Sequence, residues 1–492
     1  MTVSAARRRT ITAGLLLGML LGALEATVVG TAMPTVIASL GGLNHYSWVF
    51  SAYLLTSTAS VPIWGRLSDL YGRRRLYLIG VGLFMVGSAL AGVAQSMEQL
   101  IAFRALQGLG AGALVPLAMT IISELYTIAE RPRVQALFSG MWGVSSIAGP
   151  LVGGYLTDAL SWRWIFYINI PFGLLTAVVI RAAYPGHGQT RVVSIDWAGA
   201  ALLFAAVTTL LAGLSHISGP AWPWIAGSLI LSVVFAGVER RAPEPILPLT
   251  LFRRRIVSTT LAVVFLLGVG MFAAVAFVPL LVQGVFGGTA SQAGRALTPL
   301  FLGWVGMSIA GARLTLVIGY RPTAWIGTVL MALSFVGLAF VHAGVPRWYL
   351  HAASLGLGSG MGFAMLALLL AIQHAVPRSE LGIATSLNQF ARSIGAAIGV
   401  AAMGAVLSWM LGPGIDLQAG SAHGALALDA AGIERLDAAL RAVFATCAGV
   451  SSLAIIPLVA LPPVDFGGGM RTSVGEELLA AETTTIDPKA RA

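Results

Sequence analysis

Apolar residues fill most of this chain in long blocks of roughly 20 positions, which short polar segments separate. A helix rises about 1.5 Å per residue, so each block can cross a hydrocarbon core of about 30 Å. The pattern predicts an all-α polytopic membrane protein with fourteen spanning helices. We expect these helices at residues 11–34, 46–65, 76–95, 98–122, 134–156, 164–183, 197–215, 222–238, 257–282, 292–312, 323–342, 348–376, 383–411 and 439–461.

The composition excludes the soluble classes of protein. Of the 492 residues, 57% are hydrophobic and 10% are charged, and the mean hydropathy is +0.87. Soluble domains carry about 25% charged residues, so a soluble enzyme or a disordered chain is excluded. The first apolar run imitates a signal peptide but continues past Glu25 to Pro34, so we expect it to remain as a helix. One cysteine, Cys447, allows no disulfide framework and no cysteine-based metal site.

The basic residues indicate the orientation in the membrane. The net charge is +10, but the arginines lie between apolar blocks and form no patch on a folded domain, which argues against a nucleic-acid partner. Most of the 29 Arg and Lys residues fall in loops on the side of the N-terminus. Such loops face the cytoplasm, so we expect both termini there and an even number of spans. The outer segment 412–438 is predicted to be a solvated connector.

Three ionisable side chains stand well inside predicted spans: Glu25, Arg104 and Arg392. Each costs at least about 2.5–3.5 kcal/mol at bilayer depth, so each needs an explanation. The helical rise places Glu25 and Arg104 at similar heights, where they can face each other, and Arg392 near the midplane. One interpretation is a static ion pair in which the buried charges neutralise each other and have no further role.

The other reading is a proton site. Burial disfavours the charged form of the Glu25 carboxylate and a nearby cation favours it, so the group can gain and lose a proton as its surroundings change. A proton-coupled carrier needs that behaviour. With two arginines against one carboxylate, a neutral, monocationic or amphiphilic cargo is favoured over a polycation.

The loop after the second span reads Gly65-Arg66-Leu67-Ser68-Asp69-Leu70-Tyr71-Gly72-Arg73-Arg74-Arg75. Gly65 is expected to allow close packing, Gly72 the chain reversal, and Asp69 a contact with a helix N-terminus or an arginine. At every defining position this loop resembles the signature loop of the major facilitator superfamily of secondary transporters.

Further motifs resemble the fourteen-helix drug:proton antiporter branch of that family. The fourth span carries Arg104-Ala105-Leu106-Gln107-Gly108-Leu109-Gly110-Ala111-Gly112, and the fifth carries Gly140, Gly143, Gly149, Pro150, Gly153 and Gly154. The sixth begins Trp162-Arg163-Trp164-Ile165-Phe166-Tyr167-Ile168-Asn169-Ile170-Pro171. In the first span, Glu25 stands where that branch usually has aspartate.

The resemblance implies a fold of two six-helix bundles with two inserted helices. The implied units are a cytoplasmic N-terminus (1–10), a first bundle (11–183), an inserted helix pair with a linker (184–256), a second bundle (257–461) and a cytoplasmic tail (462–492). It implies a proton-driven exporter of amphiphilic small molecules in a bacterial inner membrane, in contact with lipid, without cofactor or metal, and we expect a monomer.

The resemblance also assigns roles to residues. Glu25, Arg104 and Arg392 would serve proton coupling and substrate. The residues of the cytoplasmic gate would be Gly65, Asp69, Gly72, Arg73, Arg74 and Glu124. The interface of the fifth span would be shaped by Gly143, Gly149, Pro150, Gly153 and Gly154. The matching loop of the second half, 311–321, lacks the aspartate, which leaves a second gate open to question.

Two alternatives remain open. The first keeps the fold and changes the cargo to one metabolite or a lipid. The second is a membrane enzyme or receptor that does not transport. An enzyme would need clustered reactive groups, whereas His351 and His374 stand 23 residues apart near opposite ends of one span.

Overall fold

A computed structural model describes residues 4–42, 45–126, 131–185, 196–214, 222–242, 251–342, 344–376, 381–412 and 429–462. Within these ranges the chain is helical and has no strand. The helices are α1 (Ala5–Leu40), α2 (Tyr46–Tyr71), α3 (Arg73–Gly92), α4 (Met97–Leu125), α5 (Arg131–Ala159), α6 (Trp164–Tyr167), α7 (Asn169–Ala183), α8 (Trp197–Leu214), α9 (Trp222–Glu239), α10 (Arg255–Leu280), α11 (Ala290–Ile318), α12 (Tyr320–Ala339), α13 (Arg347–His374), α14 (Leu381–Leu411), α15 (Ala430–Leu453) and α16 (Ile455–Val459).

The predicted fourteen-helix membrane fold is confirmed. Three predicted spans consist of two consecutive helical pieces: α6 with α7, α10 with the π-helix η3 (Leu281–Val285), and α15 with α16. Among the described residues, eleven of the resulting segments are long and apolar enough to cross a membrane by length and composition alone. The others, α2, α5 and α8, complete the fourteen.

Two predicted boundaries are wrong. The first span was expected to end at Pro34, but α1 continues to Leu40, because a spanning helix tolerates a proline where neighbouring helices satisfy its backbone. The last helix begins at Ala430 inside the segment expected to be a connector, and the Asp429 carboxylate accepts from Gly432 N at 2.8 Å to cap it. Residues 413–428 and 463–492 lie outside the described ranges.

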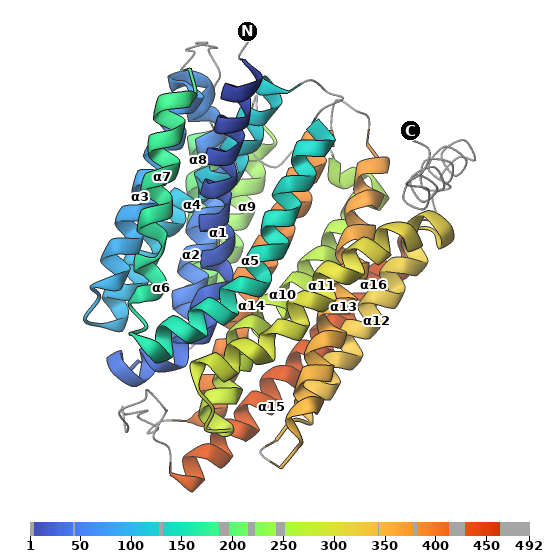
Figure 1. Cartoon of the computed structure of the whole chain (residues 1–492). Coiled ribbons are helices and arrows are strands. Elements are labelled where there is room, and N and C mark those ends of the chain that lie inside the picture. Colours follow the sequence, from blue (N-terminus) through green and yellow to red (C-terminus); the bar gives the residue numbers. More distant parts are fainter. Residues whose placement is uncertain are drawn as a thin grey trace, which may run out of the picture.

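The helices form two halves, shown at the left and right of Figure 1. The first half is α1–α7 and the second is α10–α16. The halves meet where α5 packs on α11, α2 on α14, and α1 on α10. The inserted pair lies beside that junction, because α8 contacts both α2 and α14 while α9 packs on α8. The domain boundaries implied by the sequence stay a prediction.

The halves are joined at the ends of the helices opposite the start of α1. We call the end where α1 begins the inner end and the opposite end the outer end, following the predicted orientation. Gln283 Nε2 donates to the carbonyl of Thr31 at 2.8 Å, three residues before Pro34 of α1. Tyr46 donates from α2 to the carbonyl of Ala276, three residues before the proline of α10. In each case the donor bonds a helical turn in which a proline weakens the helix's own hydrogen bonding.

Asp158 makes a second outer connection between the halves. It is the penultimate residue of α5, and its Oδ1 and Oδ2 accept from the backbone N–H groups of Ala290 and Ser291 at 3.1 and 2.9 Å. These are the first two residues of α11. A carboxylate of one half therefore caps a helix of the other, where the helix dipole favours negative charge.

Candidate functional site

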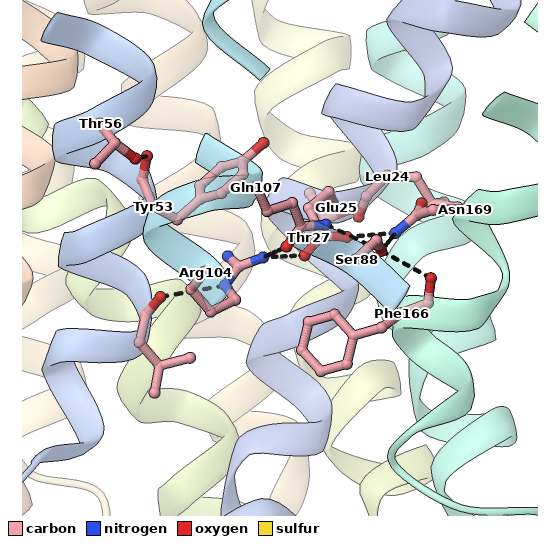
Figure 2. Close-up of polar contacts among 11 residues, drawn as sticks. Leu24, Glu25, Thr27, Tyr53, Thr56, Ser88, Arg104, Gln107, Phe166 and Asn169 are labelled. Carbon is pink, nitrogen blue, oxygen red and sulfur yellow. Dashed lines mark hydrogen bonds and ion pairs between the residues drawn. The ribbon is translucent and has the colours of Figure 1, made fainter. Parts of the chain in front are cut away.

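Glu25 and Arg104 form a buried ion pair inside the first half. Arg104 Nη1 on α4 donates to Glu25 Oε1 on α1, and each residue is 1% exposed (Figure 2). The pairing agrees with the heights estimated from the sequence. Removing one member of such a pair costs about 3–5 kcal/mol, because it leaves the other charge buried without a counter-charge.

Amide and hydroxyl groups complete the shell around this pair. Asn169 of α7 donates through Nδ2 to Glu25 Oε2 at 2.6 Å and to Ser88 Oγ at 3.1 Å. Gln107 accepts from Arg104 at 2.7 Å and donates to Ser88 Oγ at 3.1 Å, as Figure 2 shows. Ser88 of α3 donates in turn to the carbonyl of Phe166 at 2.8 Å. Four helices of one half thus converge on a single carboxylate.

The guanidinium of Arg104 has further partners on α2. Its Nε donates to the carbonyl of Val49 at 3.3 Å, and its carbon lies 4.2 Å from the ring centre of Tyr53. The ring of Phe166 lies on another side at 5.8 Å. A cation over an aromatic face is stabilised by the charge distribution of the ring. Arg104 therefore has favourable contacts besides its ion pair with Glu25.

Glycines bring these helices close enough for the network to form. A Cβ atom on Gly87 of α3 would lie 2.5 Å from Gln107 N, and one on Gly108 of α4 would lie 2.5 Å from the carbonyl oxygen of Tyr53. Gly110 similarly meets Phe84 N at 2.3 Å. Small residues at these positions allow the backbones of α2, α3 and α4 to touch.

A second charged cluster lies at the inner end. Gly72 has a φ of +88° and joins α2 to α3, a conformation that side chains other than glycine rarely adopt. Arg73, directly after it, pairs with Glu124 at 2.5 Å, and the hydroxyl of Tyr184 donates to the same carboxylate at 2.5 Å. Burial, with Glu124 beside it, raises the pKa of Tyr184. Arg74 is half-buried.

The structure corrects one expectation for this loop. Gly65 was expected to pack closely, but among the described residues no atom lies within 4 Å of a Cβ built on it. The ion pair between Arg73 and Glu124, two residues expected at a gate, stays within the first half. The side chain of Asp69 lies outside the described part of the chain.

The glycines of the fifth span divide between two neighbours. A Cβ on Gly149 would lie 2.0 Å from Thr27 Oγ1, and one on Gly153 would lie 2.8 Å from the carbonyl of Val28, so both face α1. A Cβ on Gly154 would lie 2.6 Å from the carbonyl of Ala290 on α11.

The remaining residues of that motif face the second half. The carbonyl of Pro150 lies 2.1 Å from a Cβ built on Gly294 of α11, while Gly143 meets Val305 at an ordinary 3.6 Å. Helix α5 therefore holds both halves at once: it packs on α1 within its own half and on α11 across the junction.

Arg392 does not join Glu25 and Arg104, although the sequence grouped the three. It is half-buried on α14 in the second half, and its Nη2 donates to Gln389 Oε1 of the same helix at 2.7 Å. The backbone at Arg392 packs against Gly268 of α10. Depth alone could not separate them, because residues of equal height can belong to different bundles.

Sequence reasoning missed the partners that hold the carboxylate. Asn169 and Gln107 lie inside the motifs quoted from the sequence, and a buried amide in an apolar span was the available signal. Ser88 carried no signal of its own. Within the described residues, no group of three or more His, Cys, Asp or Glu side chains could hold a metal ion.

Comparison with known proteins decides the family. The model of the Major Facilitator Superfamily matches residues 15–400. The chain belongs to the major facilitator superfamily. Members of this superfamily are transporters, so the chain is a multi-span membrane transporter and not an enzyme.

Curated relatives and solved structures agree with this assignment. The chain is 39% identical to the Multidrug transporter protein MdtP of Bacillus subtilis over 82% of this chain and 76% of that protein. It is 37% identical to the Multidrug resistance protein 3 of the same species over 82% and 80%. The crystal structure of a D-xylose-proton symporter matches with a TM-score of 0.64 at 14% identity, covering 92% of this chain and 98% of that one. At that identity it shows the fold alone.

Proposed function

We propose that this transporter exports amphiphilic small molecules across a bacterial inner membrane in exchange for protons. The observation that carries the proposal is the carboxylate of Glu25, 1% exposed, paired with Arg104 and bonded by Asn169. An ionisable group at such a depth is expensive, and in membrane proteins it commonly marks an ion or proton path. The names of the curated relatives support a multidrug cargo.

The arrangement of the halves supports an inward-facing state. Most hydrogen bonds described between the halves lie toward the outer ends, at Thr31, Ala276 and Asp158. One more joins Ser51 of α2 to the carbonyl of Ala397 near the middle of α14, at 3.2 Å. At the inner end the described gate pair, Arg73 with Glu124, belongs to one half. With both termini in the cytoplasm, as the basic loops predict, a central route would then be open to the cytoplasm and closed to the outside.

Coupling follows from the electrostatics of the pair. A proton on Glu25 neutralises the counter-charge of Arg104, which then depends on Gln107, the carbonyl of Val49 and the ring of Tyr53. The deprotonated and protonated forms therefore stabilise different packings of α1 against α4. A proton can drive the cycle only through such a difference between states.

The transport cycle then has a defined order. In the outward-facing state Glu25 takes a proton and cargo leaves. In the inward-facing state Glu25 releases the proton to the cytoplasm, and cargo enters between the halves. Arg392 lies on α14, apart from the pair of Glu25 and Arg104. We therefore assign the proton to the first half and the cargo contacts to the junction of the halves.

Dye transport in everted membrane vesicles tests the proposal. With an imposed pH gradient, ethidium accumulation is expected in vesicles carrying the wild-type protein, and it should stop when nigericin collapses the gradient. Glu25→Gln should abolish it. Glu434→Gln, an exposed glutamate on α15, is the matched control and should retain wild-type transport. Transport by Glu25→Gln at the wild-type rate, or transport insensitive to nigericin, would contradict proton coupling.

A further inference from the structure

A line of buried polar groups follows the packing of α1, α3 and α7. Asn169 Oδ1, Tyr77 Oη and Thr176 Oγ1 have no hydrogen-bond partner among the described residues. Tyr77 and Thr176 are 0% exposed and Asn169 is 1% exposed. Buried polar groups are normally satisfied by protein or by ordered water. Each of these atoms therefore has hydrogen-bonding capacity that no described residue uses.

Tyr77 and Thr176 form one level of this line. They meet beside Gly18, where a Cβ atom would lie 2.0 Å from Tyr77 Oη and 3.1 Å from Thr176 Cγ2. Gly18 precedes Glu25 on α1, and Thr176 follows Asn169 on α7, by two helical turns in each case, which is about 10 Å. Because α1 runs outward and α7 runs inward, this level lies on the inner side of the carboxylate.

Polar groups continue from that level to the inner surface. The hydroxyls of Thr12 and Tyr126 are 2.7 Å apart, and Thr12 lies nearly two turns closer to the inner end than Gly18. Tyr184, beyond the end of α7, donates to Glu124 at 2.5 Å. The side chain of Glu124 is 46% exposed, so the line ends on a carboxylate that water reaches.

The opposite direction differs on α1. Outward of Glu25, the buried residues include Val28, Val29, Ala32 and Met33, each at most 1% exposed, and the buried hydroxyls of Thr27 and Thr31 already donate to backbone carbonyls of their own helix. The rings of Trp162 and Phe166 close this side in an edge contact at 6.3 Å. A proton on Glu25 therefore has, along its inner side, hydroxyls that are unpartnered among the described residues, whereas the buried hydroxyls of α1 on its outer side are already bonded.

We propose that Tyr77 and Thr176 relay protons between Glu25 and the inner surface, through water held inside the first half. This inference rests on the proposed proton coupling at Glu25. A hydroxyl both donates and accepts hydrogen bonds, so it can receive a proton on one side while it releases its own on the other. Protons thus leave through the first half, apart from the cargo route at the junction of the halves.

Apolar side chains interrupt the line at two places. Val179 and Ile180 lie beside Gly14, inward of the Gly18 level. The other interruption separates the two upper levels. Met85 and Leu21 approach Gly173 there. A Cβ atom built on Gly173 would lie 2.5 Å from Met85 Sδ and 3.7 Å from Leu21 Cδ1. Methionine is unbranched and adapts its shape readily. Movement of Met85 connects the Glu25 level with Tyr77 and Thr176, while its packed position keeps the carboxylate dry.

Stopped-flow measurement of proton release separates a relay from a structural role. The full-length protein in detergent is mixed with tetraphenylphosphonium in weak buffer, and a pH indicator dye reports the rate and the extent of release. Tyr77→Phe and Thr176→Val remove one hydroxyl each and preserve side-chain shape. Thr328→Val on α12 is the matched control, because its hydroxyl is also unpartnered among the described residues and 0% exposed but lies in the second half.

Both relay variants are expected to release protons about tenfold more slowly or slower still, with unchanged extent and unchanged binding of the probe. Thr328→Val should keep the wild-type rate. Wild-type rates in both relay variants, or a slower rate that only follows weakened probe binding, would overturn the relay. Glu25→Gln tests the underlying proposal separately: it should release nothing, and undiminished release from it would overturn proton coupling at Glu25 itself.

Discussion

Removing the carboxylate of Asp158 should open the outer side of the transporter. Asp158 lies near the outer end of α5 in the first half, and its carboxylate accepts from the first two N–H groups of α11 in the second half. The bond must break whenever the halves separate at the outer end. Asp158→Ala therefore destabilises the inward-facing state selectively, because the outward-facing state does not contain the contact.

The size of the effect follows from the capping geometry. Replacing a capping carboxylate by alanine costs about 1 kcal/mol, and the exposed position of Asp158 argues against a larger value. A free-energy change of about 1 kcal/mol moves a two-state ratio about fivefold. Asp429→Ala is the matched control, since Asp429 caps α15 within a single half through Gly432 N at 2.8 Å.

Distances between spin labels report the populations. The single cysteine, Cys447, is replaced by alanine, and labels are placed at Val93 of the first half and Trp409 of the second, which are 55% and 79% exposed near the outer end. Asp158→Ala should increase the long-distance fraction about fivefold relative to the short one. An unchanged distribution, or an equal change in Asp429→Ala, would refute the assignment of Asp158 as an outer connection.

Three further predictions concern packing and charge. Gly72→Ala should lower the free energy of unfolding by about 1–2 kcal/mol, because Gly72 has a φ of +88°. Gly65→Ala should leave the free energy of unfolding unchanged or raise it slightly, because Gly65 lies in a helix with open space around its Cβ position. Thermal unfolding in detergent compares the two variants. Gly294→Ala should wedge α11 away from α5 and raise the outward-facing fraction in the spin-label assay, and an unchanged distance distribution would contradict this. A double-mutant cycle on Arg73 and Glu124 should give a coupling energy below about 1 kcal/mol, since their side chains are 25% and 46% exposed; a coupling of several kcal/mol would show that the pair is more enclosed than its exposure indicates.

The sequence predicts the helices because bilayer thickness fixes the length of an apolar span. It also places Glu25 and Arg104 at similar heights, where they can face each other, because the helical rise fixes the depth of each residue in its span. The predicted boundary at Pro34 was wrong because the helix continues through the proline. The carbonyl of Thr31, in the turn that the proline loosens, accepts from Gln283, which is far away in the sequence. Hydropathy contains no information about such a partner.

The rest of the site depends on how the helices are rotated against one another. Ser88 and Asn169 face Glu25 because glycines set the contacts of α3 and α4, and hydropathy alone does not reveal which face of an apolar helix turns inward. The packing of Gly65 depends on the conformation of the transporter. Close packing there would require the halves to meet at the inner end, whereas most of the described hydrogen bonds between the halves lie toward the outer end. Arg392 shows that depth without rotation does not identify a cluster.

Proton release on cargo binding tests the central claim most directly. When tetraphenylphosphonium binds to the purified transporter at constant pH, titration of the weakly buffered solution counts the protons released. The wild-type protein should release protons, and Glu25→Gln, verified as folded by its thermal unfolding and as binding the probe, should release none. Equal release by the two proteins would show that the proton resides elsewhere and would contradict the assignment of coupling to Glu25.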